Sequence, residues 1–169
     1  MNTLYTKVLL YTYPNISSLI DQIDELVEKK AISSMDSTLP CIEICNSVIN
    51  LIKEKDLYLK LMVVLEDVLK TLSEEEMLCV EYKYFLEKDK FKHIDFDYTS
   101  KQYFRRQNAI IEKVRKRLEK KGIDDNFFKE NCLPIKFFSV LLRGVKEKEK
   151  LNNKNKKKGL VIQDKKAYA

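Results

Sequence analysis

Glycine and proline, the residues that most often interrupt a helix, occur only three times each in the 169 residues of this chain. Between them run long segments in which apolar residues recur every three or four positions, the spacing that places them on one face of a helix. No segment alternates apolar and polar residues for long, as a half-buried strand would. Because 44% of the residues are hydrophobic, these helices can bury a core. The sequence therefore predicts an all-α protein.

The N-terminal part of the chain is predicted to form a bundle of helices. Residues 2–12 suit either a short helix or a strand, and a regular amphipathic helix begins after Pro14. A further helix is expected after Pro40, and the next is expected from about residue 56 to 72. That last helix is apolar around most of its circumference, which predicts a central position.

A helix-turn-helix is predicted after this bundle. In the sequence S-E-E-E, the Ser73 side chain can accept from the backbone N–H of Glu76, while the Glu76 carboxylate can accept from the N–H of Ser73. The helix that starts there is followed by a short apolar helix at about 90–96, a tight turn at 97–99, and a long basic helix at 100–121. This order is that of a tri-helical helix-turn-helix, in which the last helix enters the major groove.

The net charge of +6 is distributed unevenly along the chain. Residues 1–97 carry −7, residues 98–121 carry nine Lys or Arg against two acids, residues 122–145 are neutral, and residues 146–169 carry +6. A solvated helix face normally mixes both signs. The excess of positive charge at 98–121 therefore favours a helix that binds an anionic partner. The alternative is a solvated amphipathic helix in a bundle.

The basic helix divides into two faces at about 100° per residue. Phe104, Ile111, Val114 and Leu118 are predicted on the buried side. On the other side, Arg and Gln side chains can bind guanine and adenine edges, and a small alanine permits close approach. The start of the helix can direct N–H groups at a phosphate. Further along the helix, phosphates can bind the basic residues Arg115, Lys116, Arg117 and Lys120. The candidate DNA contacts are Ser100, Lys101, Gln102, Arg105, Arg106, Ala109, Lys113, Lys116 and Arg117.

Two further segments complete the chain. Residues 122–145 are predicted to form short helices, of which the apolar IKFFSVLLRGV either packs back on the N-terminal helices or forms a partner surface. Residues 146–169 are predicted to form a basic, flexible tail, because so few apolar residues cannot offset the ordering entropy. We thus divide the chain into a helical interaction domain (1–72), a helix-turn-helix DNA-binding domain (73–121), C-terminal helices (122–145) and the tail.

Other chemistry has little support in the sequence. The four cysteines form no CxxC pair and are predicted to be free thiols in a reducing cytoplasm. We expect no metal site and no cofactor, since His93 lies far from the cysteines and the acids beside it are better explained as part of a turn. No phosphate-binding or nucleophile motif indicates an enzyme. No apolar run has membrane length, so no membrane partner is predicted.

The sequence resembles a known family. The segments LSEEEMLCVEYKYF (72–85) and SKQYFRRQNAIIEKVRKRL (100–118) resemble the sigma-region-4-like domain of phage and prophage transcription regulators of the ArpU and RinA type. The segment TKVLLYTYPNISSLIDQIDELVEKK is similar to the helical segment that precedes this domain. The resemblance spans about residues 4–121. It implies a late-gene regulator that binds promoter DNA, with Ser100, Lys101, Gln102, Arg105 and Arg106 at DNA-reading positions.

The leading hypothesis is a non-enzymatic, sequence-specific transcription regulator that binds double-stranded DNA. Its N-terminal helices would serve homodimerisation or contact with RNA polymerase. One alternative is a DNA-packaging or structural adaptor, a small-terminase-like oligomer that uses the same helix-turn-helix. Another is a helical adaptor that binds only proteins.

Overall fold

The computed structural model describes the backbone of residues 1–33, 41–85 and 100–166, and the side chains of 1–32, 41–85 and 102–151. The chain forms α1 (Thr3–Thr12), a 3-10 turn (Tyr13–Asn15), α2 (Ile16–Ser33), α3 (Cys41–Leu69), α4 (Glu74–Val80), a π-helical turn (Glu81–Phe85), α5 (Ser100–Lys120), α6 (Asp125–Phe127), a second π-helical turn (Phe128–Cys132) and α7 (Lys136–Lys166). No strand occurs in the described ranges, so the prediction of an all-α protein is confirmed.

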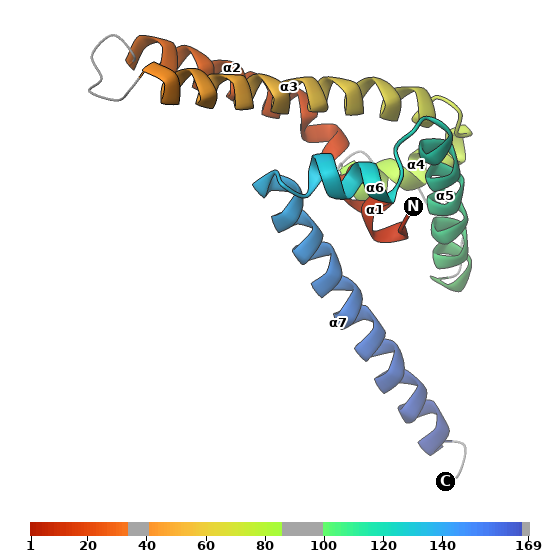
Figure 1. Ribbon diagram of the computed structural model, residues 1–169. Helices are drawn as coiled ribbons and strands as arrows, with labels where there is room; N and C mark the ends of the chain where they lie inside the picture. Colours follow the sequence, from red (N-terminus) through yellow and green to blue (C-terminus); the bar gives the residue numbers. More distant parts are fainter. Residues whose placement is uncertain (34–40, 86–99, 167–169) are drawn as a thin grey trace.

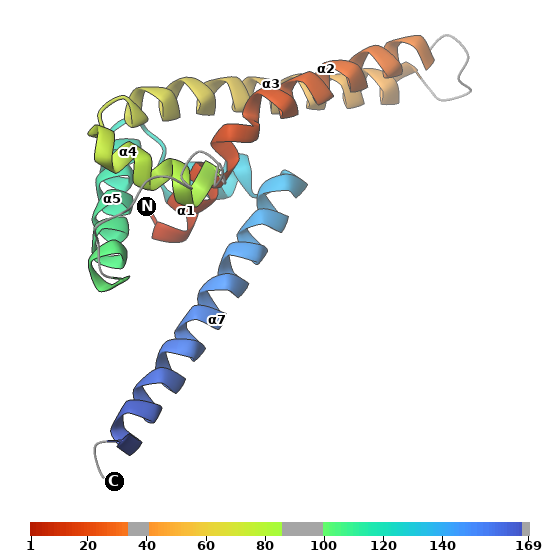
Figure 2. The ribbon, with the colours of Figure 1, turned by 180° about the vertical axis from the view of Figure 1, so that it is seen from behind.

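Helices α2 and α3 form a long antiparallel hairpin that extends away from the other helices (Figures 1 and 2). The sequence predicted two helices where α3 is a single helix of 29 residues, and this prediction was wrong. The supposed break at residues 53–56 consists mainly of Lys and Glu, which are good helix formers. Because neither Gly nor Pro interrupts the segment, the helix continues through it.

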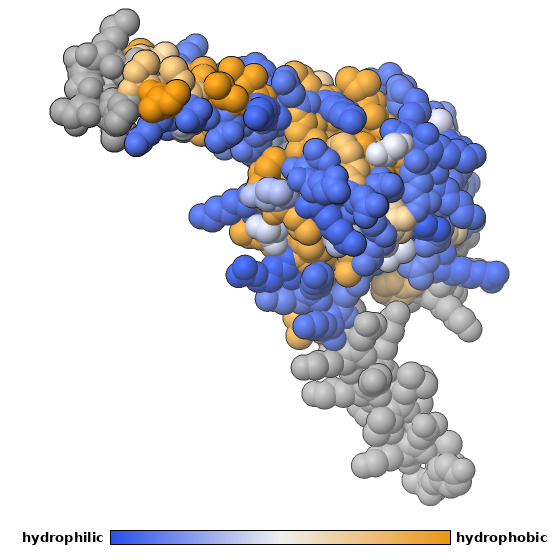
Figure 3. All heavy atoms as spheres, in the orientation of Figure 1, coloured by the Kyte–Doolittle hydropathy of each residue, from blue (hydrophilic) through white to orange (hydrophobic). Residues whose placement is uncertain are grey.

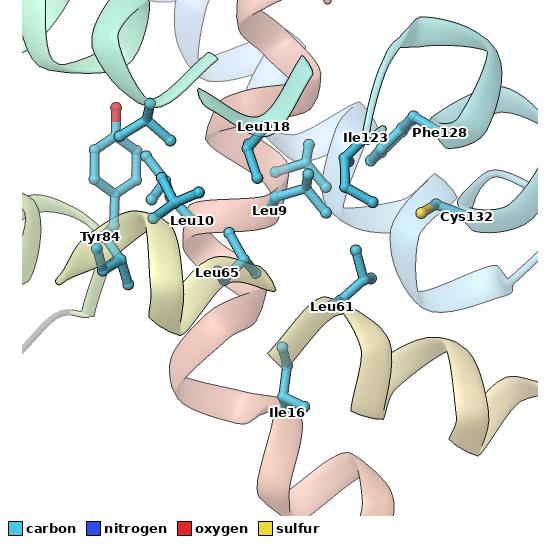
Figure 4. Close-up of a cluster of buried hydrophobic side chains, with 14 of the residues drawn as sticks. Leu9, Leu10, Ile16, Leu61, Leu65, Tyr84, Leu118, Ile123, Phe128 and Cys132 are labelled. Atoms are coloured by element: carbon cyan, nitrogen blue, oxygen red, sulfur yellow. The ribbon is translucent and has the colours of Figure 1, made fainter. Parts of the chain in front are cut away.

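Helix α1 lies at the centre of the fold and resolves the choice between helix and strand at residues 2–12. The side chains of Val8, Leu9 and Leu10 are fully buried, and α5, α7 and the π-helical turn at 81–85 all pack against this helix. Figure 4 shows Leu9 and Leu10 among Leu65 of α3, Leu118 of α5 and other buried side chains. Every side of this short helix therefore contributes to the core.

The C-terminal apolar segment packs back on the N-terminal helices, which is one of the two predicted outcomes. Phe138, Leu142 and Val145 of α7 are buried, and α7 packs against α1. The Phe138 ring stacks on the ring of Tyr58 in α3 at 5.6 Å between centroids. One buried cluster thus draws on α1, α2, α3, α4, α5 and α7.

The ends of two helices differ in how well the sequence predicted them. Gly122 adopts a φ of 81°, and the N–H of Ile123 donates to the carbonyl of Leu118 at 2.9 Å, so the predicted glycine stop of α5 is confirmed. Residues 146–166, in contrast, continue α7 as one helix where a flexible tail was predicted (Figure 1). Lysine has a good helix propensity, so the segment can extend a helix already started on the core.

We predict that Leu9→Ala lowers the free energy of unfolding by about 2–5 kcal/mol, because it leaves a cavity in the most enclosed part of the core. Chemical denaturation followed by circular dichroism measures this change. The control is Val140→Ala, at a helical position that is 54% exposed, where we expect a change within about 0.5 kcal/mol. Equal effects of the two substitutions would contradict a central role for α1.

Candidate nucleic-acid interface

The first helix of the predicted helix-turn-helix begins at the expected capping box. Ser73 N–H donates to Glu76 Oε2 at 2.9 Å, and Glu76 N–H donates to Ser73 Oγ at 3.3 Å. Helix α4 follows and passes into the π-helical turn that ends at Phe85. The capping box predicted from the sequence is confirmed, and it determines where α4 starts relative to α3.

Three polar contacts hold α5 against α4. The guanidinium of Arg106 pairs with Glu75 at 2.9 Å, and the ammonium of Lys113 pairs with Glu76. Between these two ion pairs, Gln107 Nε2 donates to the backbone carbonyl of Cys79 at 2.9 Å. The contacts determine which side of α5 is turned away from the core.

Gln107 is the buried member of this group. Its side chain is almost fully enclosed, and its Nε2 also donates to the hydroxyl of Tyr103 at 3.2 Å. Burial raises the pKa of Tyr103 to about 12. The sequence placed Gln107 only at the flank of the apolar face. The signal that it would be buried was its position three residues before Ile110 and four before Ile111, both of which are buried.

The predicted DNA-reading face of α5 lies on the side away from Gln107 and next to the α4 contacts, and its residues lie at the surface. Gln102, Arg105, Arg106 and Ala109 are all exposed, and they line one shallow surface depression of about 300 Å³. Arg106 and Ala109 also line the groove between α4 and α5. The structure therefore brings these four predicted residues together on one open surface.

Phe104 departs from the prediction. The sequence placed it on the buried face, but its side chain is 47% exposed. Among the described residues of α5, fully buried side chains begin at Gln107 and continue through Ile110, Ile111, Val114 and Leu118. The helices that cover α5 thus enclose its middle and C-terminal part, and Phe104 lies beyond them.

The basic residues in the second half of α5 have different environments. Lys113 forms an ion pair with Glu76, and Arg117 is half-buried near the same carboxylate. Arg115, which the charge pattern also suggested for phosphates, instead pairs with Glu112 and Glu119 within α5, each at 2.9 Å. Lys116 is exposed and makes no ion pair with any described residue. It is therefore the best placed of these cations for a phosphate.

Part of the predicted motif lies outside the described residues. These are the short helix at 90–96, the turn at 97–99 and His93 with its neighbouring acids. Helix α5 begins at Ser100, but the side chains of Ser100 and Lys101 are also outside the described set. Their assignment to DNA contact stays a prediction, as does the helix-turn-helix arrangement as a whole.

Comparison of the chain with protein-family models, curated proteins and solved structures finds no significant match. Within the described residues, no helix combines the length and apolar character that a membrane span requires. Nor do the described side chains include a group of three or more His, Cys, Asp or Glu that could hold a metal ion.

We predict that Glu76 stabilises the fold in a pH-dependent way. The hydrogen bond from Lys113 chiefly, together with that from the backbone of Ser73, holds the pKa of Glu76 below its ordinary value of 4.5. A lowered folded-state pKa adds stability above the unfolded pKa, and this contribution is lost as the pH falls through the folded value. Glu76→Gln should therefore lower the free energy of unfolding at pH 7. Well below pH 4 the Glu76 carboxylate is protonated in both the folded and the unfolded chain, so this contribution to the free energy of unfolding should be absent with or without the substitution.

Glu74→Gln is the matched control, because it removes the same charge from the same helical turn at an exposed position. Urea denaturation of both variants and the unmodified chain across this pH range measures the difference. If Glu74→Gln and Glu76→Gln give the same pH profile, the ion pair with Lys113 is not the cause.

Proposed function

We propose that this chain is a non-enzymatic, sequence-specific DNA-binding transcription regulator, and that α5 is its recognition helix. The observation that carries the proposal is the open face formed by Gln102, Arg105, Arg106 and Ala109 on α5, a helix with eight Lys or Arg residues against two acids. The resemblance to phage late regulators supports the same function from the residue pattern.

The chemistry of this face suits the edges of base pairs. A guanidinium can donate two hydrogen bonds to O6 and N7 of guanine, and a glutamine amide can pair with N6 and N7 of adenine. Because Ala109 is small, it lets the helix backbone come close to the groove floor. Arg106 would exchange or share its ion pair with Glu75 for a base or phosphate, whereas Arg105 makes no ion pair with a described residue. Arg105 is therefore the preferred residue for testing.

RNA polymerase is proposed as a second partner, because sigma-like domains act at promoters together with it. The test is a selection of bound fragments from random double-stranded DNA, with and without RNA polymerase. Enrichment of one sequence supports base reading by the chain, and enrichment only with polymerase supports joint recognition. If neither selection enriches a sequence, the proposed function is wrong.

For the DNA-reading face of α5, we predict that Arg105→Ala and Gln102→Ala each weaken binding to the selected DNA site by about 1–3 kcal/mol. Each substitution should also relax the sequence preference of the protein. Both side chains are exposed, so the fold should be retained. Fluorescence anisotropy with the selected site and with single-base variants of it measures both effects. Loss of affinity without any change in sequence preference would contradict base reading by α5.

For the phosphate-binding part, we predict that Lys116→Ala weakens binding to all DNA sequences about equally. It should also reduce the slope of log affinity against log salt by about one, because one fewer counterion is released. The matched control is Lys29→Ala, which removes the same charge from an exposed position near the C-terminal end of α2. That end of the hairpin lies away from α5 (Figure 1). A sequence-dependent effect of Lys116→Ala, or an equal effect of Lys29→Ala, would contradict the assignment.

A further inference from the structure

Helix α3 carries a second apolar stripe that no described helix of the chain covers. The stripe consists of exposed residues at alternating intervals of three and four, with one gap at Asp56: Ile42, Cys45, Ile49, Ile52, Leu59 and Val63. This is the a/d spacing of a coiled-coil seam. The exposed fractions reach 66% at Ile42 and 56% at Val63. Figure 3 shows apolar side chains gathered along the α2–α3 hairpin.

The stripe is distinct from the side of α3 that packs in the molecule. The buried residues of α3 are Tyr58, Leu61, Leu65, Val68 and Leu69, and none of them belongs to the exposed series. Helix α2 packs on α3 as well. Lys55, which lies beside the stripe on α3, pairs with Asp24 of α2 at 2.6 Å. A single helix that buries one apolar face and exposes another at heptad spacing is suited to a second helical partner.

We propose that this stripe pairs with the same stripe of a second copy of the chain, with the two α3 helices antiparallel. A two-fold symmetric contact requires a surface that complements itself, and the stripe extends for about 32 Å along one straight helix. In a register centred on Glu54, Ile49 lies opposite the partner's Leu59, and Cys45 lies opposite the partner's Val63. The two stripes then cover each other from Cys45 to Val63, while Ile42 lies level with the partner's Glu66 at the end of the contact.

The charges favour the antiparallel direction. Asp56 is the charged residue in the middle of the stripe, and a parallel pair would place two Asp56 carboxylates opposite each other. In the antiparallel register, Asp56 lies opposite the partner's Ile52 and next to the partner's Lys53. Lys53 is exposed, whereas Lys60 on the same side lies over the Phe127 ring at 4.6 Å. Opposite charges thus meet across the seam.

The shape of the molecule favours the same direction. The other helices of the protein gather at one end of the hairpin, and the far end extends alone (Figures 1 and 2). An antiparallel pair places these other helices of the two copies at opposite ends of the seam, whereas a parallel pair would place them side by side. The two α5 faces would then both remain open. The dimer does not depend on DNA binding, so its test is independent of the proposed function.

The first test is the mass of the full chain in solution by analytical ultracentrifugation. We expect a reversible dimer of twice the 20.0 kDa chain mass. Ile49→Glu should raise the dimer dissociation constant at least about tenfold, because it buries an unpaired charge in the seam. The control is Val140→Glu, an exposed apolar position on α7, which should leave the constant unchanged. A monomer at all concentrations, a larger oligomer, or equal effects of the two variants would overturn the proposal.

The second test determines the direction by disulfide formation under an added thiol oxidant, in a Cys41→Ser background. Val63→Cys should give a covalent dimer, because its thiol lies opposite the partner's Cys45. The background without Val63→Cys should stay uncrosslinked, since the two Cys45 residues would be about 27 Å apart, far beyond the reach of a disulfide. Crosslinking of the background through Cys45, or failure of Val63→Cys to crosslink, would overturn the antiparallel pairing.

Discussion

The burial of α1 on every side is the constraint on which the rest of the structure depends. A ten-residue helix is too short to be stable in water alone, so it exists only because its neighbours enclose it. Those neighbours are far apart in the sequence: α5, α7 and the π-helical turn at 81–85 all pack on it. Removing this helix would leave each of them with an apolar face and no common surface, which explains why one core links residues 8 to 145.

The orientation of α5 follows from this core together with its polar contacts to α4. Apolar packing alone leaves a helix free to rotate by some tens of degrees, because hydrophobic contacts have little directionality. The amide of Gln107 and the ion pairs of Arg106 and Lys113 have defined geometry, and they lie along the α4 side of the helix. These contacts keep Gln102, Arg105 and Ala109 at the surface. Two of the candidate DNA-binding cations, Arg106 and Lys113, are therefore already paired with carboxylates of α4.

The two ends of the molecule have different physical characters. The end that contains α5 is basic and polar at its surface, while the α2–α3 hairpin exposes apolar side chains at heptad spacing. A seam that excludes water and a face that attracts phosphate are best kept apart, since burying the lysines and arginines of α5 in a protein contact would be costly. In the proposed dimer the hairpins pair and the basic helices stay accessible.

Several features could be predicted from the sequence because they are local. The capping box at Ser73, the stop at Gly122 and the two faces of α5 depend on residues within a few positions of each other, and periodicity alone predicts an all-helical chain. The uninterrupted α3 and the long α7 were missed where charged residues suggested a loop or tail. Helix propensity and packing of one end against the core outweigh local polarity there.

The sequence by itself determined that the protein is helical and which residues of α5 share its polar side, because both depend on side chains a few positions apart. Only the tertiary structure decided that the short N-terminal helix is central, that Gln107 is buried while Phe104 is half exposed, and that one of two apolar faces of α3 stays uncovered. These properties depend on contacts between residues that are far apart in the sequence, 28 positions for Gln107 and Cys79, or on where a neighbouring helix ends. Periodicity cannot distinguish a face that is buried within the chain from one left for a partner.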